Sequence, residues 1–123
     1  MPLSTNIMRG GTSAGQAKAI NNGAIASAVS AAGTTITDAT DLLADINFVS
    51  TVASGAGVQL SHGEAGDSQI VYNAGANALK VYPSNSAASI NTLSAGVAHN
   101  LPINTMCTYY KVSSTQWIAN LSA

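Results

Sequence analysis

The feature that most constrains the fold is a pair of strand-like runs on either side of an Asn/Gly segment. The runs 68–73 and 78–83 are rich in β-branched and aromatic residues, and residues 74–77 between them read Ala-Gly-Ala-Asn. Asn and Gly tolerate the positive φ angles of tight turns, so this pattern is typical of a β-hairpin. The sequence therefore predicts a hairpin with a four-residue loop at the centre of an all-β domain.

Strand-like runs continue along the rest of the chain. They cover residues 46–52, 58–60, 90–93, 97–101, 106–112 and 116–121. With the hairpin, this makes about eight short strands at a spacing of about 8–12 residues, which favours a sandwich or barrel. We expect a small β-sandwich, jelly-roll-like, at 41–123. Within it, Tyr72 and Trp117 fit the inward-facing positions, and 38–45 is compatible with a capped helical turn.

The residues before this domain have a different texture. Residues 1–40 consist mostly of small residues with isolated aliphatic side chains. We predict an extended N-terminal arm that becomes ordered on a partner, because Ile20, Ile25 and Val29 are apolar anchors that a plain linker does not need. A disordered tail is the alternative.

Charge is scarce throughout the chain. Only 7% of the 123 residues are charged, against about 25% in an average globular protein, and the formal net charge is −1. There is no basic patch for nucleic acid. A free monomer with so few charges would have poor colloidal stability. The composition favours a chain that hides much of its surface in an assembly.

The start of the sequence and its cysteine content bear on location. The first six residues contain neither a basic segment nor a long apolar run, so we expect no signal peptide and no membrane span. Cys107 is the single cysteine, which leaves no partner for an intrachain disulfide. We expect synthesis in a cytoplasm, with stability supplied by packing or assembly.

Two groups of residues are candidates for chemistry. His62, Glu64 and Asp67 share one loop, but their spacing matches no established metal site, and Asp67 is better placed to cap the turn. His99 and Cys107 could form a nucleophile pair, yet no oxyanion-hole glycine motif accompanies them. We interpret both groups as structural and predict no enzyme activity, no metal and no cofactor.

The aromatic residues allow two interpretations. Tyr72, Tyr82, Tyr109, Tyr110 and Trp117 could form a platform on which sugar rings stack. Tyr72 and Trp117 are better core candidates. Tyr82 and Tyr109 are expected to be exposed, and Tyr is enriched at protein interfaces. We therefore predict that Tyr82 and Tyr109 lie in an oligomer interface.

An ordered series of short motifs resembles a β module of tailed-bacteriophage structural proteins. The series is Gly57-Val58-x-Leu60, Gly66-Asp67, Val71-x-Asn73, Gly75-Ala76, Leu79-x-Val81-Tyr82-Pro83, Ile90-Asn91 and Val112-Ser113-x-x-x-Trp117. It covers most of residues 44–121. Upstream, the runs 9–17 and 44–47 are similar to the arm that precedes such modules.

The resemblance implies a capsid decoration (cement) protein or part of a tail or head fibre. Such proteins are small β-sandwich or jelly-roll-like domains, often trimeric, with neither cofactor nor catalysis. The expected function is to stabilise a phage capsid by binding between capsomers as a homotrimer, with the major capsid protein as partner and the virion surface as location. The alternative is a host-recognition module of a fibre that binds glycans.

Overall fold

The structure is a computed structural model that describes residues 25–61 and 64–122. These residues form ten strands and no helix. The strands are β1 (Ile25–Ser30), β2 (Thr40–Leu42), β3 (Ile46–Thr51), β4 (Gly57–Leu60), β5 (Ser68–Asn73), β6 (Leu79–Tyr82), β7 (Ser89–Ile90), β8 (His99–Leu101), β9 (Met106–Ser113) and β10 (Gln116–Leu121). The all-β prediction is confirmed, and each of the eight predicted strands overlaps an observed one.

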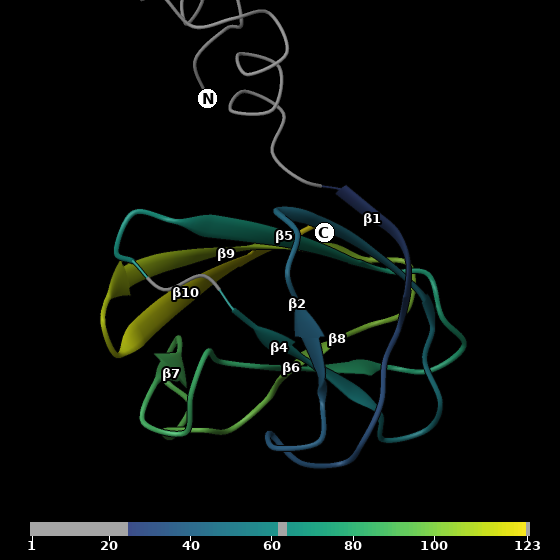
Figure 1. Ribbon diagram of the computed structural model, residues 1–123, viewed down its shortest axis with the longest axis horizontal. Coiled ribbons are helices and arrows are strands. Elements are labelled where there is room, and N and C mark those ends of the chain that lie inside the picture. Colours follow the sequence, from purple (N-terminus) through teal and green to yellow (C-terminus); the bar gives the residue numbers. More distant parts are fainter. Residues whose placement is uncertain (1–24, 62–63, 123) are drawn as a thin grey trace, which may run out of the picture.

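The strands lie in two sheets that pack face to face (Figure 1). The larger sheet has the order β1-β3-β5-β9-β10-β7, and the smaller has the order β2-β4-β6-β8. Successive strands from β1 to β6 alternate between the two sheets. Within each sheet these strands pair in parallel: β1 with β3, β3 with β5, β2 with β4 and β4 with β6. The chain thus winds through three coils in a β-solenoid-like arrangement. The prediction of a jelly-roll-like sandwich is therefore wrong, because parallel pairing between successive coils differs from the antiparallel pairing of a jelly roll.

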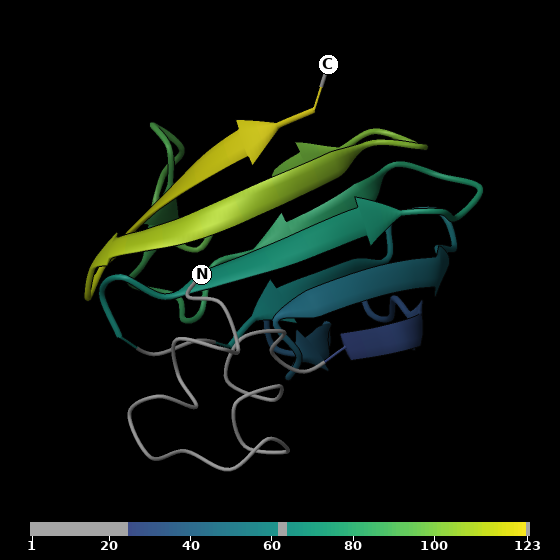
Figure 2. The same cartoon turned by 90° about the horizontal axis from the view of Figure 1, so that it is seen from above.

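Antiparallel strands close one end of the winding. β8 pairs antiparallel with β6, and β9 pairs antiparallel with β5. β9 and β10 form a hairpin whose turn lies at residues 114–115, between the predicted strands 106–112 and 116–121. Seen from above, β9 and β10 lie at one side of the larger sheet and β1 at the other (Figure 2).

The predicted central hairpin is wrong. β5 and β6 belong to different sheets, so the segment between them crosses from one layer to the other (Figure 1). Asn73 directs this crossing: its side-chain oxygen accepts the Gly75 N–H at 3.0 Å, and its amide nitrogen donates to the carbonyls of Asn77 and Leu101. A Cβ at Gly75 would lie 2.5 Å from the Val52 side chain, so the corner requires glycine. The Asn/Gly signal marks a corner here, and no hairpin.

The folded domain begins before residue 41. β1 pairs with β3, the Ala31 N–H donates to the Thr51 carbonyl, and the Tyr82 hydroxyl donates to the Thr34 carbonyl at 3.0 Å. Residues 25–40 are therefore part of the two-sheet body, which corrects the arm predicted for 1–40 over that range. The predicted helical turn at 38–45 contains β2 instead, because the Asp38 carboxylate accepts N–H groups that precede it. Residues 1–24, with Ile20, lie outside the described residues.

The core lies between the two sheets. Its largest members are Trp117 and Tyr109, both fully buried. Aliphatic side chains of both sheets complete it, among them Leu42, Val49, Val58, Leu60, Val71, Leu79, Val81, Ile90 and Leu101. The core prediction for Trp117 is confirmed. The core prediction for Tyr72 is wrong, because the inward positions of β5 are held by Gln69, Val71 and Asn73. Tyr72 lies on the outward face of β5 and is half-buried.

Buried amide side chains bond to the backbone where the chain turns between sheets. Gln69 is fully buried; its Nε2 donates to the carbonyls of Leu42 and Ala44 at 2.8 and 3.0 Å, and its Oε1 accepts the Ser61 N–H at 2.9 Å. Carbonyls at a corner lie outside the sheet ladders, and a buried polar group without a partner costs about 1–3 kcal/mol. These amides therefore hold the corners together.

Candidate interaction surface on the larger sheet

The outer side of the larger sheet carries a continuous apolar surface. Side chains alternate across each strand, so the residues between the buried ones point away from the core. We call this surface the outer apolar face; it comprises Ile25, Ile46, Phe48, Ile70, Tyr72, Met106, Tyr110 and Ile118. Phe48, Met106, Tyr110 and Ile118 are each 42–45% exposed.

The strand register aligns these side chains in rows. Phe48 pairs with Tyr72, and Tyr72 pairs with Met106 in the next strand. In the adjacent row, Ile25 pairs with Ile46, and Ile46 with Ile70. The rings of Phe48 and Tyr72 stack, with centroids 5.4 Å apart and planes 12° from parallel. Together the two rows cross four strands, and Tyr110 and Ile118 pair in a third row beside Ser68, so the apolar groups lie on one face and are not isolated exposures.

Charge is missing from this face. Among the residues of the six strands in the larger sheet, Lys111 carries the single charge. Lys111 is 4% exposed and points inward, with its Nζ 5.5 Å from the Trp117 ring centroid and 3.4 Å from Ser84 Oγ. Hydroxyl and amide groups of Ser68, Thr108 and Asn120 supply the polar atoms on the outer face. Such a contiguous apolar surface is typical of an interaction site.

The residues predicted for the oligomer interface lie elsewhere. Tyr109 is fully buried and Tyr82 is 7% exposed, so the expectation that they are exposed is wrong. Tyr82 lies under the segment that contains Thr34, and Tyr109 points inward from β9. Neither ring can anchor a partner on the surface of the folded domain. The exposed tyrosine of β9 is its neighbour, Tyr110.

The three residues predicted to anchor the arm do not share one environment. Ile25 is 65% exposed and extends the outer apolar face at the edge strand β1. Val29 is partly buried against the core, so it is not available in full as a surface anchor. Ile20 lies outside the described residues.

His99 and Cys107 flank Tyr109; Cys107 and Tyr109 are fully buried, and His99 is half-buried. His99 Nδ1 lies 2.9 Å from the Tyr109 hydroxyl, and Cys107 is fully buried two residues along the same face of β9. Burial raises the pKa of the Cys107 thiol and raises the pKa of Tyr109 well above its usual value, and the neighbouring thiol adds to the latter shift. An activated nucleophile requires a lowered thiol pKa. This geometry favours neutral, structural side chains.

In the loop before β5, Asp67 forms hydrogen bonds within the turn. Its carboxylate accepts the Glu64 N–H at 3.2 Å, and its own N–H donates to the Glu64 carbonyl. Asp67 therefore caps the turn, as predicted. His62 lies outside the described residues. Within 25–61 and 64–122, no three His, Cys, Asp or Glu side chains gather in a group that could hold a metal ion.

Comparisons with family models, with curated proteins and with solved structures found no match. In the described ranges, no helix has the length and apolar character needed to cross a membrane. The outer apolar face is thus the feature on which a functional proposal rests. Apart from β1, its strands were predicted, but its extent was not. The available signal was that β3 and β5 carry large apolar residues at both odd and even positions, a pattern of strands covered on both faces.

The half-buried His99 gives a testable pH dependence. Burial lowers the pKa of His99 below 6.5, so the unfolded chain takes up a proton more readily than the folded one. Stability should therefore fall as the pH drops below about 6.5 and level off once the folded-state pKa is passed. We expect urea denaturation to show a steeper loss for the wild type than for His99→Gln. Parallel curves for the two proteins would contradict this assignment.

Proposed function

We propose that this protein is a virion structural protein that decorates and stabilises a phage capsid without covalent bonds. It would bind between capsomers as a homotrimer, with the major capsid protein as partner. The observation that carries the proposal is the uncharged outer apolar face. The sequence resemblance to phage structural modules supplies the phage context. Under this proposal the protein is made in the host cytoplasm and resides on the capsid surface.

The outer apolar face is suited to a contact between copies of the chain. Burial of apolar surface contributes about 25 cal/mol per Å², and no charged side chain on this face would have to be desolvated. A free protein with this face in water would associate non-specifically. We therefore assign Phe48, Tyr110 and Ile118 to the trimer interface in place of Tyr82 and Tyr109. Ile25, at the edge of the sheet, retains the capsid contact predicted for the arm.

Analytical ultracentrifugation with a matched pair of variants tests the interface. The wild type should sediment as a trimer, and Phe48→Asp/Ile118→Asp should be a folded monomer because two charges would be buried in an apolar contact. Val97→Asp is the control: Val97 is 44% exposed, as much as the other two, but precedes β8 at the far edge of the smaller sheet. A monomeric wild type, or a trimeric double variant, would disprove the interface.

Capsid binding is tested separately by sedimentation with shells that lack decoration. The trimer should pellet with them, and a gel of purified virions should show hundreds of copies of the chain. Failure to pellet would refute the decoration role even if the trimer forms.

A glycan-binding fibre module is the alternative function. The observation that favours it is the stacked, partly exposed Phe48–Tyr72 pair, because aromatic faces can stack on sugar rings. Polar atoms of Ser68 and Thr108 lie on the same face and could bond to hydroxyl groups. A few to a few dozen copies per virion, with binding to host glycans on an array, would favour this function over decoration.

A further inference from the structure

Two polar side chains lie side by side within the outer apolar face. Thr108 of β9 pairs with Asn120 of β10, and both side chains point away from the core. Four apolar side chains surround the pair: Ile70, Met106, Tyr110 and Ile118. A partner that covers these apolar side chains therefore also covers Thr108 and Asn120.

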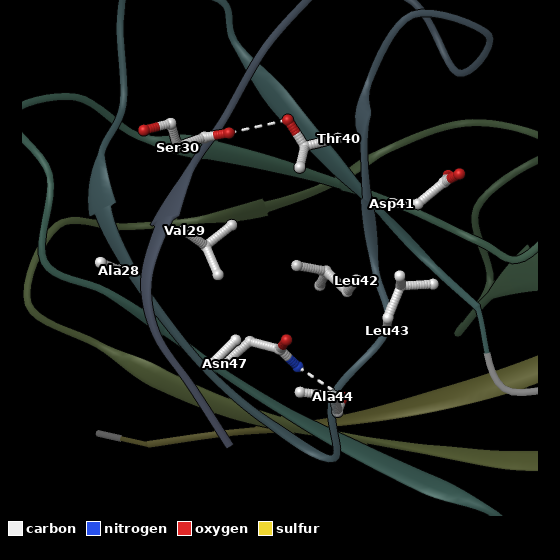
Figure 3. Close-up of a pocket in the computed structure, with 10 residues that line it drawn as sticks. Ala28, Val29, Ser30, Thr40, Asp41, Leu42, Leu43, Ala44 and Asn47 are labelled. Atoms are coloured by element: carbon white, nitrogen blue, oxygen red, sulfur yellow. Dashed lines mark hydrogen bonds between the residues drawn. The ribbon is translucent and has the colours of Figure 1, made fainter. Parts of the chain in front are cut away.

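Asn120 is the exception among the amide side chains in the strands of the larger sheet. The others donate to backbone carbonyls: Asn47, Gln69, Asn73 and Gln116. Figure 3 shows one of these bonds, from Asn47 to the Ala44 carbonyl, beside a pocket of about 430 Å³ between β1 and β2. The Asn120 side chain is exposed and forms no hydrogen bond within the described ranges. Its donor and its acceptor are both available to a partner.

The chemistry of an amide selects the partner. An amide that is buried without hydrogen bonds is costly, so a contact over Asn120 must supply both an acceptor and a donor. A second copy of Asn120 supplies both, because the same side chain carries an N–H donor and a carbonyl acceptor. No charged side chain on this face calls for a partner of opposite charge. Other copies of the chain therefore fit this position.

We propose that Asn120 lies at the axis of the trimer and fixes the number of copies. The three amides form a closed ring in which each Nδ2 donates to the Oδ1 of the next copy, with Tyr110 and Ile118 packed around it. A single buried amide sets the oligomeric state of coiled coils in the same way. The inference rests on the proposed function, because it adds a specificity-determining residue to the proposed trimer interface.

Disulfide trapping in the full chain tests the position of Asn120. In Asn120→Cys, mild oxidation should link two chains of each trimer, because residues at a symmetry axis meet their own copies. A non-reducing gel detects the linked chains. Asn100→Cys is the matched control and should stay unlinked: Asn100 is also exposed, but lies in β8 of the smaller sheet. The native Cys107 is buried.

A charge at the same position gives a pH-dependent readout. Asn120→Asp would place three carboxylates together, so the trimer should bind about tenfold or more weakly at pH 7. Protonation below about pH 4 removes the repulsion and should restore the trimer. Analytical ultracentrifugation measures both states. Asn100→Asp should remain a trimer at both pH values.

The effect on copy number is tested with Asn120→Leu. Leucine has a similar size but neither donor nor acceptor, so the chains should still associate while losing the single stoichiometry. Native mass spectrometry should show several oligomers for Asn120→Leu and a uniform trimer for Asn100→Leu.

Failure of the ring and failure of the trimer give different results. A wild type that is not a trimer would remove both. A trimeric wild type whose Asn120→Cys variant stays unlinked, or whose Asn120→Asp variant is an unweakened trimer at pH 7, would overturn the ring alone. A uniform trimer of Asn120→Leu would show that Asn120 does not fix the number of copies.

Discussion

Trp117→Ala is expected to destabilise the protein by about 3–5 kcal/mol, the usual cost of removing a large buried aromatic side chain. Trp117 is fully buried between the sheets, its Nε1 donates to Ser84 Oγ at 3.2 Å, and its ring lies beside the Lys111 ammonium group. The substitution would leave a cavity and remove the aromatic neighbour of a buried cation. Urea denaturation followed by circular dichroism measures the loss.

The matched control for this prediction is Val97→Ala. Val97 is 44% exposed, and a surface truncation usually changes stability by about 0.5 kcal/mol or less.

Native tryptophan fluorescence of the wild type should also be blue-shifted and resistant to quenching by iodide. Similar losses for the two variants, or ready quenching of the wild type, would show that Trp117 is not in the core.

Gln69→Leu is expected to cost about 3 kcal/mol, although leucine has a similar size and is more apolar. The substitution removes the partner of the Ser61 N–H and of the Leu42 and Ala44 carbonyls. Each buried group left without a partner costs about 1–3 kcal/mol. The Ser61 hydroxyl also donates to the Leu42 carbonyl, which limits the loss at that oxygen.

Gln59→Leu is the control for the amide prediction. Gln59 donates to the Ser84 carbonyl and is only half-buried, so the loss of this bond should cost about 1 kcal/mol. Chemical denaturation of both variants compares the two costs. A stable Gln69→Leu protein would mean that the corner carbonyls find other partners.

Local patterns in the sequence predicted where the strands lie. The alternation in 106–112 and 116–121 is strong, and these segments form β9 and β10 of a hairpin. Trp117 could be assigned to the core because one large apolar residue stands at an inward position of a clear strand. Such signals depend on neighbours within a few residues, and short-range alternation records them.

The pairing of the strands could not be predicted in the same way. In a solenoid-like winding the hydrogen-bond partner lies about one coil away, so the Asn/Gly segment at 74–77 indicated a local hairpin although β5 and β6 separate into two sheets. Parallel pairing leaves no turn signal between partners. β1 was missed because its small residues resemble a linker, and it is a strand only beside β3.

The inward face of β5 was assigned the wrong way round for a physical reason. Ile70 and Tyr72 are the larger apolar residues, whereas the inward positions hold Gln69, Val71 and Asn73. The two amides are buried because corner carbonyls require donors, a demand that appears only once the chain is folded. The outer apolar face escaped prediction in part because Tyr72 was assigned to the core and Ile25 to the arm.

The antiparallel cap also limits how the molecule can polymerise. End-to-end stacking of solenoids into a filament requires two complementary ends, each able to continue the parallel winding. Beyond β5 and β6 the strand direction reverses at β9 and β8, the larger sheet ends at β7, and Pro102 follows β8 directly. A second molecule cannot add parallel coils there. Growth into a filament by head-to-tail continuation of the parallel winding is therefore blocked at this end.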